Sequence, residues 1–193
     1  MNKILHKFSM FELVIMSVIA SLGIAMKVVI KPIMQIVCGP FMIPTGTLAG
    51  GFYMMWLIIG VGLIKKPGTA VVISVVQAML VLFTGVVASQ GIMSFLVYIA
   101  PGLAVELLYL VIRHDACCVG CCALGGMLAN IVGVALINVI FFKAPGVYLI
   151  LVLSVAALSG IIGGVLAWKL LKVFDSFYML KKGEQGKSRW EEG

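Results

Sequence analysis

Long apolar segments, separated by short clusters of glycine, proline and charged residues, make up most of the chain. A helix needs about 20 mostly apolar residues to cross a hydrocarbon layer of about 30 Å. Six segments of about this length follow one another: Phe11–Ile30, Gly46–Ile64, Thr69–Ala88, Ile92–Ile112, Cys117–Phe142, and Val147 to the Lys169/Lys172 region. The pattern predicts an all-α, polytopic membrane protein with six transmembrane helices.

Two stretches break this pattern. The segment Lys31–Pro44 holds Pro32, Pro40 and Pro44, which argues against a single regular helix, so we expect an irregular or re-entrant outer loop there. Residues 181–193 are polar and rich in glycine, which is typical of disorder. We therefore expect one six-helix transmembrane domain over residues 1–180 and a disordered cytoplasmic tail over residues 181–193.

Composition excludes a soluble protein. Of 193 residues, 63% are hydrophobic and 11% are charged, and the mean hydropathy is +1.21. A soluble domain typically has about 25% charged residues. The net charge of +7 is concentrated at the edges of the apolar segments and in the tail. Membrane topology accounts for this placement, so we expect no nucleic-acid partner.

The basic residues predict the orientation. Eleven of the 14 lysines and arginines fall on one side of the six expected helices, and this side includes both ends of the chain. The other side receives Lys27, Lys31 and Lys143. Because lysine and arginine favour the cytoplasmic side, we expect both termini in the cytoplasm of a multi-pass, bacterial cell-membrane protein.

The sequence offers no catalytic set. His6 and His114 lie at the expected cytoplasmic ends, Asp115 and Asp175 lie outside the apolar segments, and no zinc-protease motif is present. We therefore expect no enzyme, no metal and no cofactor. The cysteines Cys117, Cys118, Cys121 and Cys122 lack the spacing of a zinc ribbon, so small buried residues explain them best, with palmitoylation as an alternative.

Polar side chains inside apolar helices are candidates for binding a ligand. Glu106 is the foremost, since an ionisable group in a membrane helix is costly and must face protein or a water-filled cavity. Gln77, Asn130 and Asn138 are further candidates, although hydrogen bonds between helices are the usual task of such groups. The sequence leaves both readings open for each of them.

Aromatic residues supply possible stacking faces. Tyr53 and Trp56 lie deep enough in the second segment to contact a ring. Tyr98 is a further candidate, although its place near the outer interface also suits an aromatic belt. Lys27 and Lys31 lie one turn apart near the outer end of the first segment, where snorkelling toward the interface is the simplest interpretation.

Small residues recur at every fourth position of the first segment, at Ser17, Ser21 and Ala25. Such a face allows another helix to approach closely. Similar pairs, Gly46 with Gly50 and Gly160 with Gly164, occur in two other segments. Several such faces favour a partner helix in addition to internal packing.

Taken together, the chain resembles the substrate-binding (S) components of energy-coupling factor (ECF) transporters, and most of all the YkoE type, associated with thiamine and hydroxymethylpyrimidine. The resemblance covers the first four segments. It rests on four stretches: Val14-Ile15-Met16-Ser17-Val18-Ile19, Gly39-Pro40, Lys65-Lys66-Pro67-Gly68-Thr69-Ala70 and Gly102-Leu103-Ala104-Val105-Glu106. One departure is Ser74, which stands where members of this type carry an acidic residue.

The resemblance implies a capture subunit of an ABC importer. It would bind a vitamin or vitamin precursor from outside, under a lid formed here by Lys31–Pro44. It would then dock through Ser17, Ser21 and Ala25 onto a separate transmembrane (T) component driven by two ATPases. The main alternative is a small scaffold or regulatory membrane subunit without a ligand. A channel is disfavoured because no segment carries a repeating polar stripe.

Overall fold

The computed structural model describes residues 8–39, 45–84, 93–112, 118–142 and 146–191, and all regular secondary structure in these ranges is helical. The all-α class predicted from the sequence is therefore confirmed for this part of the chain. The elements are α2 (Met10–Cys38), α3 (Thr45–Ile64), α4 (Thr69–Thr84), α5 (Met93–Ile112), α6 (Val119–Ile137), the π-helical η3 (Asn138–Phe142) and α7 (Gly146–Glu191).

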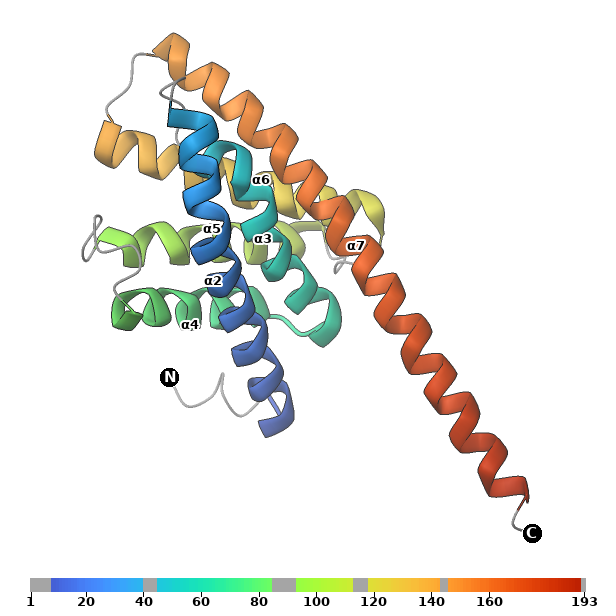
Figure 1. Ribbon diagram of the computed structural model, residues 1–193. Helices are drawn as coiled ribbons and strands as arrows, with labels where there is room; N and C mark the ends of the chain where they lie inside the picture. Colours follow the sequence, from blue (N-terminus) through green and yellow to red (C-terminus); the bar gives the residue numbers. More distant parts are fainter. Residues whose placement is uncertain (1–7, 40–44, 85–92, 113–117, 143–145, 192–193) are drawn as a thin grey trace.

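The helices form a closed ring. Neighbours in this ring are α2, α3, α7, α6, α5 and α4 in order, and α4 packs back against α2. Helix α3 also contacts α4 and α6, so it takes the central place. In Figure 1, the axes of α2, α3 and α7 are tilted alike, with the chain of α2 running opposite to that of α3 and α7, and α4, α5 and α6 cross behind them.

Glycine brings three of these helices into backbone contact. A Cβ added to Gly126 of α6 would lie 2.4 Å from the carbonyl oxygen of Gly160 in α7. Gly163 of α7 meets the backbone of Gly51 in α3 in the same way. Because lipid chains are as apolar as the helices, close packing of small residues is a main source of helix association in a membrane. The glycines therefore tie α7 to both α3 and α6.

Five helices in the described ranges are long and apolar enough to cross a membrane. They are Met10–Cys38, Thr45–Ile64, Phe95–Ile112, Val119–Ile140 and Gly146–Ser176. The sixth expected span corresponds to α4, which is described over the 16 residues Thr69–Thr84; residues 85–92 lie outside the described part. The architecture is that of a polytopic membrane protein.

We expected an irregular loop from Lys31 onward, and for the residues up to Cys38 this prediction is wrong. Helix α2 continues through Pro32 and ends at Cys38. Proline removes one backbone hydrogen bond, yet it is tolerated in membrane helices where neighbouring groups and local adjustment compensate. The rest of the expected lid, residues 40–44, lies outside the described part.

Helix α7 differs from its expected length. It runs from Gly146 to Glu191 over 46 residues, so helix is present through most of the segment 181–193 for which we expected disorder. Its C-terminal half projects beyond the other helices (Figure 1). The boundary proposed at residue 180 therefore does not coincide with the end of a helix.

Candidate functional site

A cavity of about 140 Å³ lies within the ring. Five helices line it: α2 through Lys27, α3 through Tyr53, α4 through Gln77, α5 through Tyr98 and α6 through Asn130. We call it the five-helix cavity. Because it is bordered by Thr45 and Gly46 at the start of α3, it lies toward the bundle end opposite Lys65 and Lys66, which follow the end of α3.

Lys27 and two tyrosines form the centre of the site. The Lys27 Nζ atom lies 3.9 Å from the ring centroid of Tyr98 and 5.3 Å from that of Tyr53. An ammonium group within about 6 Å of an aromatic ring is attracted by the negative face of the ring. Lys31, one helical turn further along α2, lines the same cavity. The site is therefore a cationic group held against aromatic rings.

Two buried polar atoms at the cavity have no partner among the described residues. They are the Tyr53 hydroxyl oxygen and the Gln77 Nε2 atom, and Gln77 is only 6% exposed. An unsatisfied buried polar group costs free energy comparable to a lost hydrogen bond. A ligand with hydrogen-bond acceptors would satisfy Gln77 Nε2, so the cavity wall offers an open donor to a bound molecule.

Gly23 of α2 leaves the room that the Gln77 side chain occupies. A Cβ added to Gly23 of α2 would lie 2.5 Å from Gln77 Nε2, so any larger residue at position 23 would displace the amide. Gly23 lies one turn before Lys27 on the same face of α2. The bare backbone at Gly23 thus lets α4 and α2 approach, which places Gln77 beside the Lys27 face.

Asn130 serves both the cavity and the fold. Its Nδ2 atom donates to the carbonyl oxygen of Ala156 in α7 at 2.7 Å and approaches that of Thr47 in α3 at 3.5 Å. The amide fits against Gly50, where an added Cβ would overlap it. Asn130 therefore joins α6 to α3 and α7, and it also forms part of the cavity wall.

Of the seven side chains predicted to bind a ligand, four line the cavity, namely Tyr53, Gln77, Tyr98 and Asn130. The other three, Glu106, Trp56 and Asn138, are not among the lining residues. Trp56 packs against the hydrophobic core. Asn138 is 1% exposed and donates from Nδ2 to the carbonyl oxygen of Val134 at 2.9 Å.

Glu106 contacts the turn between α3 and α4. Its Oε1 atom accepts a hydrogen bond from the Gly68 amide at 2.5 Å, and its Oε2 atom accepts one from the Ala70 amide at 3.3 Å. The first amides of a helix have no partner within the helix and carry a partial positive charge. The carboxylate of Glu106 therefore caps α4. Gly68 has a φ of +95°, which favours glycine at this turn.

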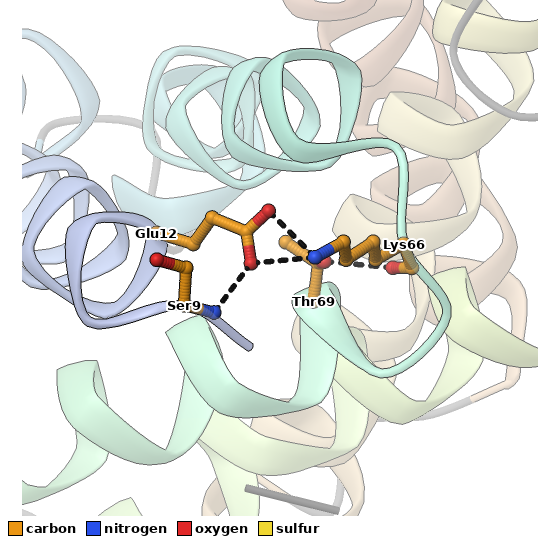
Figure 2. A network of polar contacts seen from close by, with 4 residues as sticks. All are labelled: Ser9, Glu12, Lys66 and Thr69. Carbon is orange, nitrogen blue, oxygen red and sulfur yellow. Dashed lines mark hydrogen bonds and ion pairs between the residues drawn. The ribbon is translucent and has the colours of Figure 1, made fainter. Parts of the chain in front are cut away.

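A second polar cluster lies at the same end (Figure 2). Glu12 of α2 pairs with Lys66, with Lys66 Nζ 2.7 Å from Glu12 Oε1 and 2.8 Å from Oε2. Glu12 Oε2 also accepts from the Ser9 amide at 2.8 Å, and the Thr69 hydroxyl donates to the Lys66 carbonyl oxygen at 2.7 Å. The cluster joins the start of α2 to the α3–α4 turn.

The sequence analysis missed the two lysines as site residues, because a lysine near a helix end usually snorkels. The structure shows that Lys27 lies well inside α2, because the helix continues as far as Cys38, whereas the prolines had predicted a break from Lys31 onward. An ionisable residue inside a membrane helix is a functional candidate by default.

The small-residue face of α2, formed by Ser17, Ser21 and Ala25, is exposed in the structure. The two hydroxyls donate to backbone carbonyls of their own helix, Ser17 to Leu13 at 2.9 Å and Ser21 to Ser17 at 2.8 Å. A shallow groove runs along this face and is also lined by Leu13, Val14, Val18 and Leu22. The face is apolar and its polar groups are internally satisfied, as a helix-docking surface in a membrane requires.

The structure is thus a helical membrane bundle with an internal cavity whose mostly apolar wall carries a few polar side chains. Residues 11–132 match a family described as "ABC-type cobalt transport system, permease component". The chain belongs to this family. No curated protein matches the chain.

A solved structure described as "Crystal structure of an S-component of ECF transporter" has the same fold. It is 21% identical, with a TM-score of 0.75, and the match covers 96% of this chain and 98% of that chain. The likeness in fold therefore extends over nearly the whole of both chains.

Proposed function

We propose that this chain is the substrate-binding component of an ECF-type importer. It captures a small molecule from outside in the five-helix cavity and delivers it through a T component and two ATPases. The observation that carries the proposal is a cavity lined by five helices within the fold of an S-component. A ligand-free scaffold would have no use for the buried unpartnered Gln77 amide beside Lys27.

The orientation follows from the charges. The end of the bundle that holds Lys65 and Lys66 faces the cytoplasm, because lysines and arginines favour that side. The five-helix cavity lies toward the opposite end and hence toward the outside.

The ligand is a flat, vitamin-like ring compound. Tyr53 and Tyr98 offer aromatic surface, and Gln77 and Asn130 offer amides of the kind that recognise the nitrogen and oxygen atoms of a heteroaromatic ring. The resemblance to YkoE-type proteins suggests hydroxymethylpyrimidine or thiamine. A volume of about 140 Å³ suits a molecule of this modest size.

The small-residue face of α2 serves as the docking surface for the T component. It is exposed along α2, whereas Gly23 and Lys27 of the same helix face the interior. The docked partner helix would bury Ser17, Ser21 and Ala25 against its own small residues.

The test is ligand binding followed by transport. The purified protein in detergent is titrated with hydroxymethylpyrimidine, thiamine and a wider panel of vitamin-like rings, with tryptophan fluorescence as the readout. Saturable binding of one compound is expected, together with its uptake into liposomes that contain the T component and ATPases. The matched control is Tyr148→Leu, an aromatic change outside the cavity lining. Stable partner complexes without any bound compound would contradict capture and favour the scaffold alternative.

A further inference from the structure

The five-helix cavity has an unusual charge balance. Lys27 and Lys31 both line it, and no acidic side chain of the described residues does. Among the described residues, no carboxylate forms an ion pair with either lysine. The helices that line the cavity also carry Glu12 and Glu106, but both carboxylates are engaged at the other end of the bundle. Glu12 pairs with Lys66. Glu106 accepts hydrogen bonds from the Gly68 and Ala70 amides.

The sequence supplies no acidic residue near the two lysines along the chain. The seven acidic residues include none between Glu12 and Glu106, the stretch that holds Lys27 and Lys31. Of the remaining five, three belong to the C-terminal half of α7, from Asp175 onward, and Asp115 and Glu192 lie outside the described part of the chain. Among the described residues, the positive charge at Lys27 is therefore balanced only by the ring faces of Tyr98 and Tyr53.

The start of α3 adds to the positive potential. Thr45 and Gly46, the first two residues of this helix, line the cavity together with the lysines. Helix N-termini present amides without intrahelical partners and attract anions. A Cβ added to Gly46 would meet nothing within 4 Å, so space is open beside this N-terminus.

Several polar groups at the cavity can donate hydrogen bonds to a ligand. The two ammonium groups and the unpartnered Gln77 Nε2 atom can only donate, and the Tyr53 hydroxyl has a proton to give. A ligand that completes this set needs several acceptor atoms and a negative charge. A metal cation or a cationic ring would meet only repulsion from Lys27 and Lys31.

From this balance we infer that the ligand of the five-helix cavity carries an anionic oxygen group, a carboxylate or a phosphate, on a small ring. The anionic group binds between Lys27, Lys31 and the start of α3, and the ring lies toward Gln77 and the tyrosines. The inference rests on the proposed capture function and refines it. It replaces the two compounds that the resemblance suggests, because thiamine is a cation and hydroxymethylpyrimidine carries no anionic group, and it excludes Co²⁺ on the same ground.

The test is equilibrium dialysis of the purified full chain against matched probes of different charge. The mixture holds pyridine-3-carboxylate, pyridine-3-carboxamide and the N-methyl cation of that carboxamide. It also holds pyridoxine 5′-phosphate with pyridoxine, and thiamine. Retained compounds are measured by mass spectrometry, and Co²⁺ is dialysed separately. We expect retention of an anionic probe at least tenfold above its neutral counterpart, and no retention of the cations.

Three variants assign the effect to the cavity. Lys27→Met should reduce retention of the anionic probe at least tenfold, and Lys27→Arg should keep the preference for the anion. Lys172→Met is the matched control, because Lys172 also lies over an aromatic ring, that of Trp168 at 4.4 Å, but outside the cavity. An unaltered thermal unfolding midpoint in each variant shows that the fold is intact.

The other outcomes overturn the inference in distinguishable ways. Retention of a neutral or cationic probe with loss in Lys27→Met would overturn the charge class and leave capture in this cavity standing. Anion retention that Lys27→Met leaves unchanged would overturn the assignment to this cavity. Retention of no probe of any charge would overturn the inference and count against the capture function as well.

Discussion

At the scale of single residues, Glu106 and Gln77 show that two polar groups in apolar helices can have opposite roles. Glu106 is fully used within the protein, because both carboxylate oxygens accept backbone amides at the start of α4. Gln77 is 6% exposed and keeps an unpartnered Nε2 atom beside the cavity. The first arrangement stabilises the fold, whereas the second holds a donor ready for a ligand at a cost in stability.

These roles predict opposite effects of substitution. Glu106→Ala should lower stability by about 1–3 kcal/mol, the usual cost of leaving buried partners unsatisfied, and change ligand affinity less than about twofold. Gln77→Leu should leave the unfolding temperature unchanged or higher, since it removes an unsatisfied donor, and weaken ligand binding by about 1 kcal/mol or more. Thermal unfolding in detergent and a binding titration measure both quantities.

The control is Glu12→Ala, which breaks an ion pair with Lys66 and should change stability less than Glu106→Ala does, because water screens an exposed pair. If Glu106→Ala lowered ligand affinity without lowering stability, Glu106 would bind the ligand rather than stabilise the fold. A strong destabilisation by Gln77→Leu would make Gln77 a structural link instead.

At the scale of helices, the sequence predicted where helices occur better than it predicted which side of each helix faces the interior of the bundle. Hydropathy was sufficient to place the helices, because the length needed to cross a membrane is a simple physical limit. It could not show that Lys27 points inward. A helix that is apolar nearly all round has no polar stripe to mark its exposed side, so its orientation depends on which neighbours pack against it.

Helix α2 also shows why its end was misplaced. Pro32 weakens a helix by removing a single backbone bond, and that penalty alone predicted a break. The helix nevertheless continues to Cys38, because the chain in a membrane has no water to satisfy an open backbone, so helix remains the cheaper state. Glu106 was assigned to the ligand for a related reason: its partners are backbone amides, which no side-chain pattern reveals.

A prediction at this scale concerns the small-residue face of α2. Ser17→Leu combined with Ser21→Leu should leave ligand affinity unchanged, because these side chains are exposed and do not line the cavity. It should abolish co-purification with the T component and uptake in liposomes, since bulky groups prevent close helix approach.

Ser154→Leu is the matched control for that double variant. Ser154 is likewise exposed, and its hydroxyl donates to its own helix at the Ile150 carbonyl oxygen over 2.9 Å. Uptake should persist in this control. Normal uptake in the α2 double variant would mean that the T component docks elsewhere.

At the scale of the whole molecule, the two ends of the bundle differ in charge chemistry. One end holds Glu12, Lys66 and the Glu106 cap in a network of bonded charges. The other end holds Lys27 and Lys31 around the cavity, without a carboxylate among the described residues. This division fits the proposed orientation, in which the cytoplasmic end is held together by bonded charges and the outer end binds the ligand.

The orientation can be tested with the native cysteines. Cys118 is exposed at the start of α6, and the proposed topology places it on the cytoplasmic side. A membrane-impermeant maleimide should therefore label the chain in inside-out vesicles but not in intact cells. In a variant without native cysteines, Val147→Cys, at an 85% exposed position at the start of α7, should label from outside. The reverse pattern would invert the topology.

Helix α2 is a shared wall between the ligand and the partner. Gly23 and Lys27 lie at the cavity side, while Ser21 and Ala25, each two residues earlier, lie on the outside of a helix only about 10 Å thick. Under the proposed function, any shift of α2 caused by a bound ligand would therefore be presented directly to the docked T component. Linkage then requires reciprocity: if ligand strengthens docking by some factor, docking must strengthen ligand binding by that same factor. If docking strengthens ligand binding, docking alone cannot also release the ligand. Release would consequently need free energy from the ATPases.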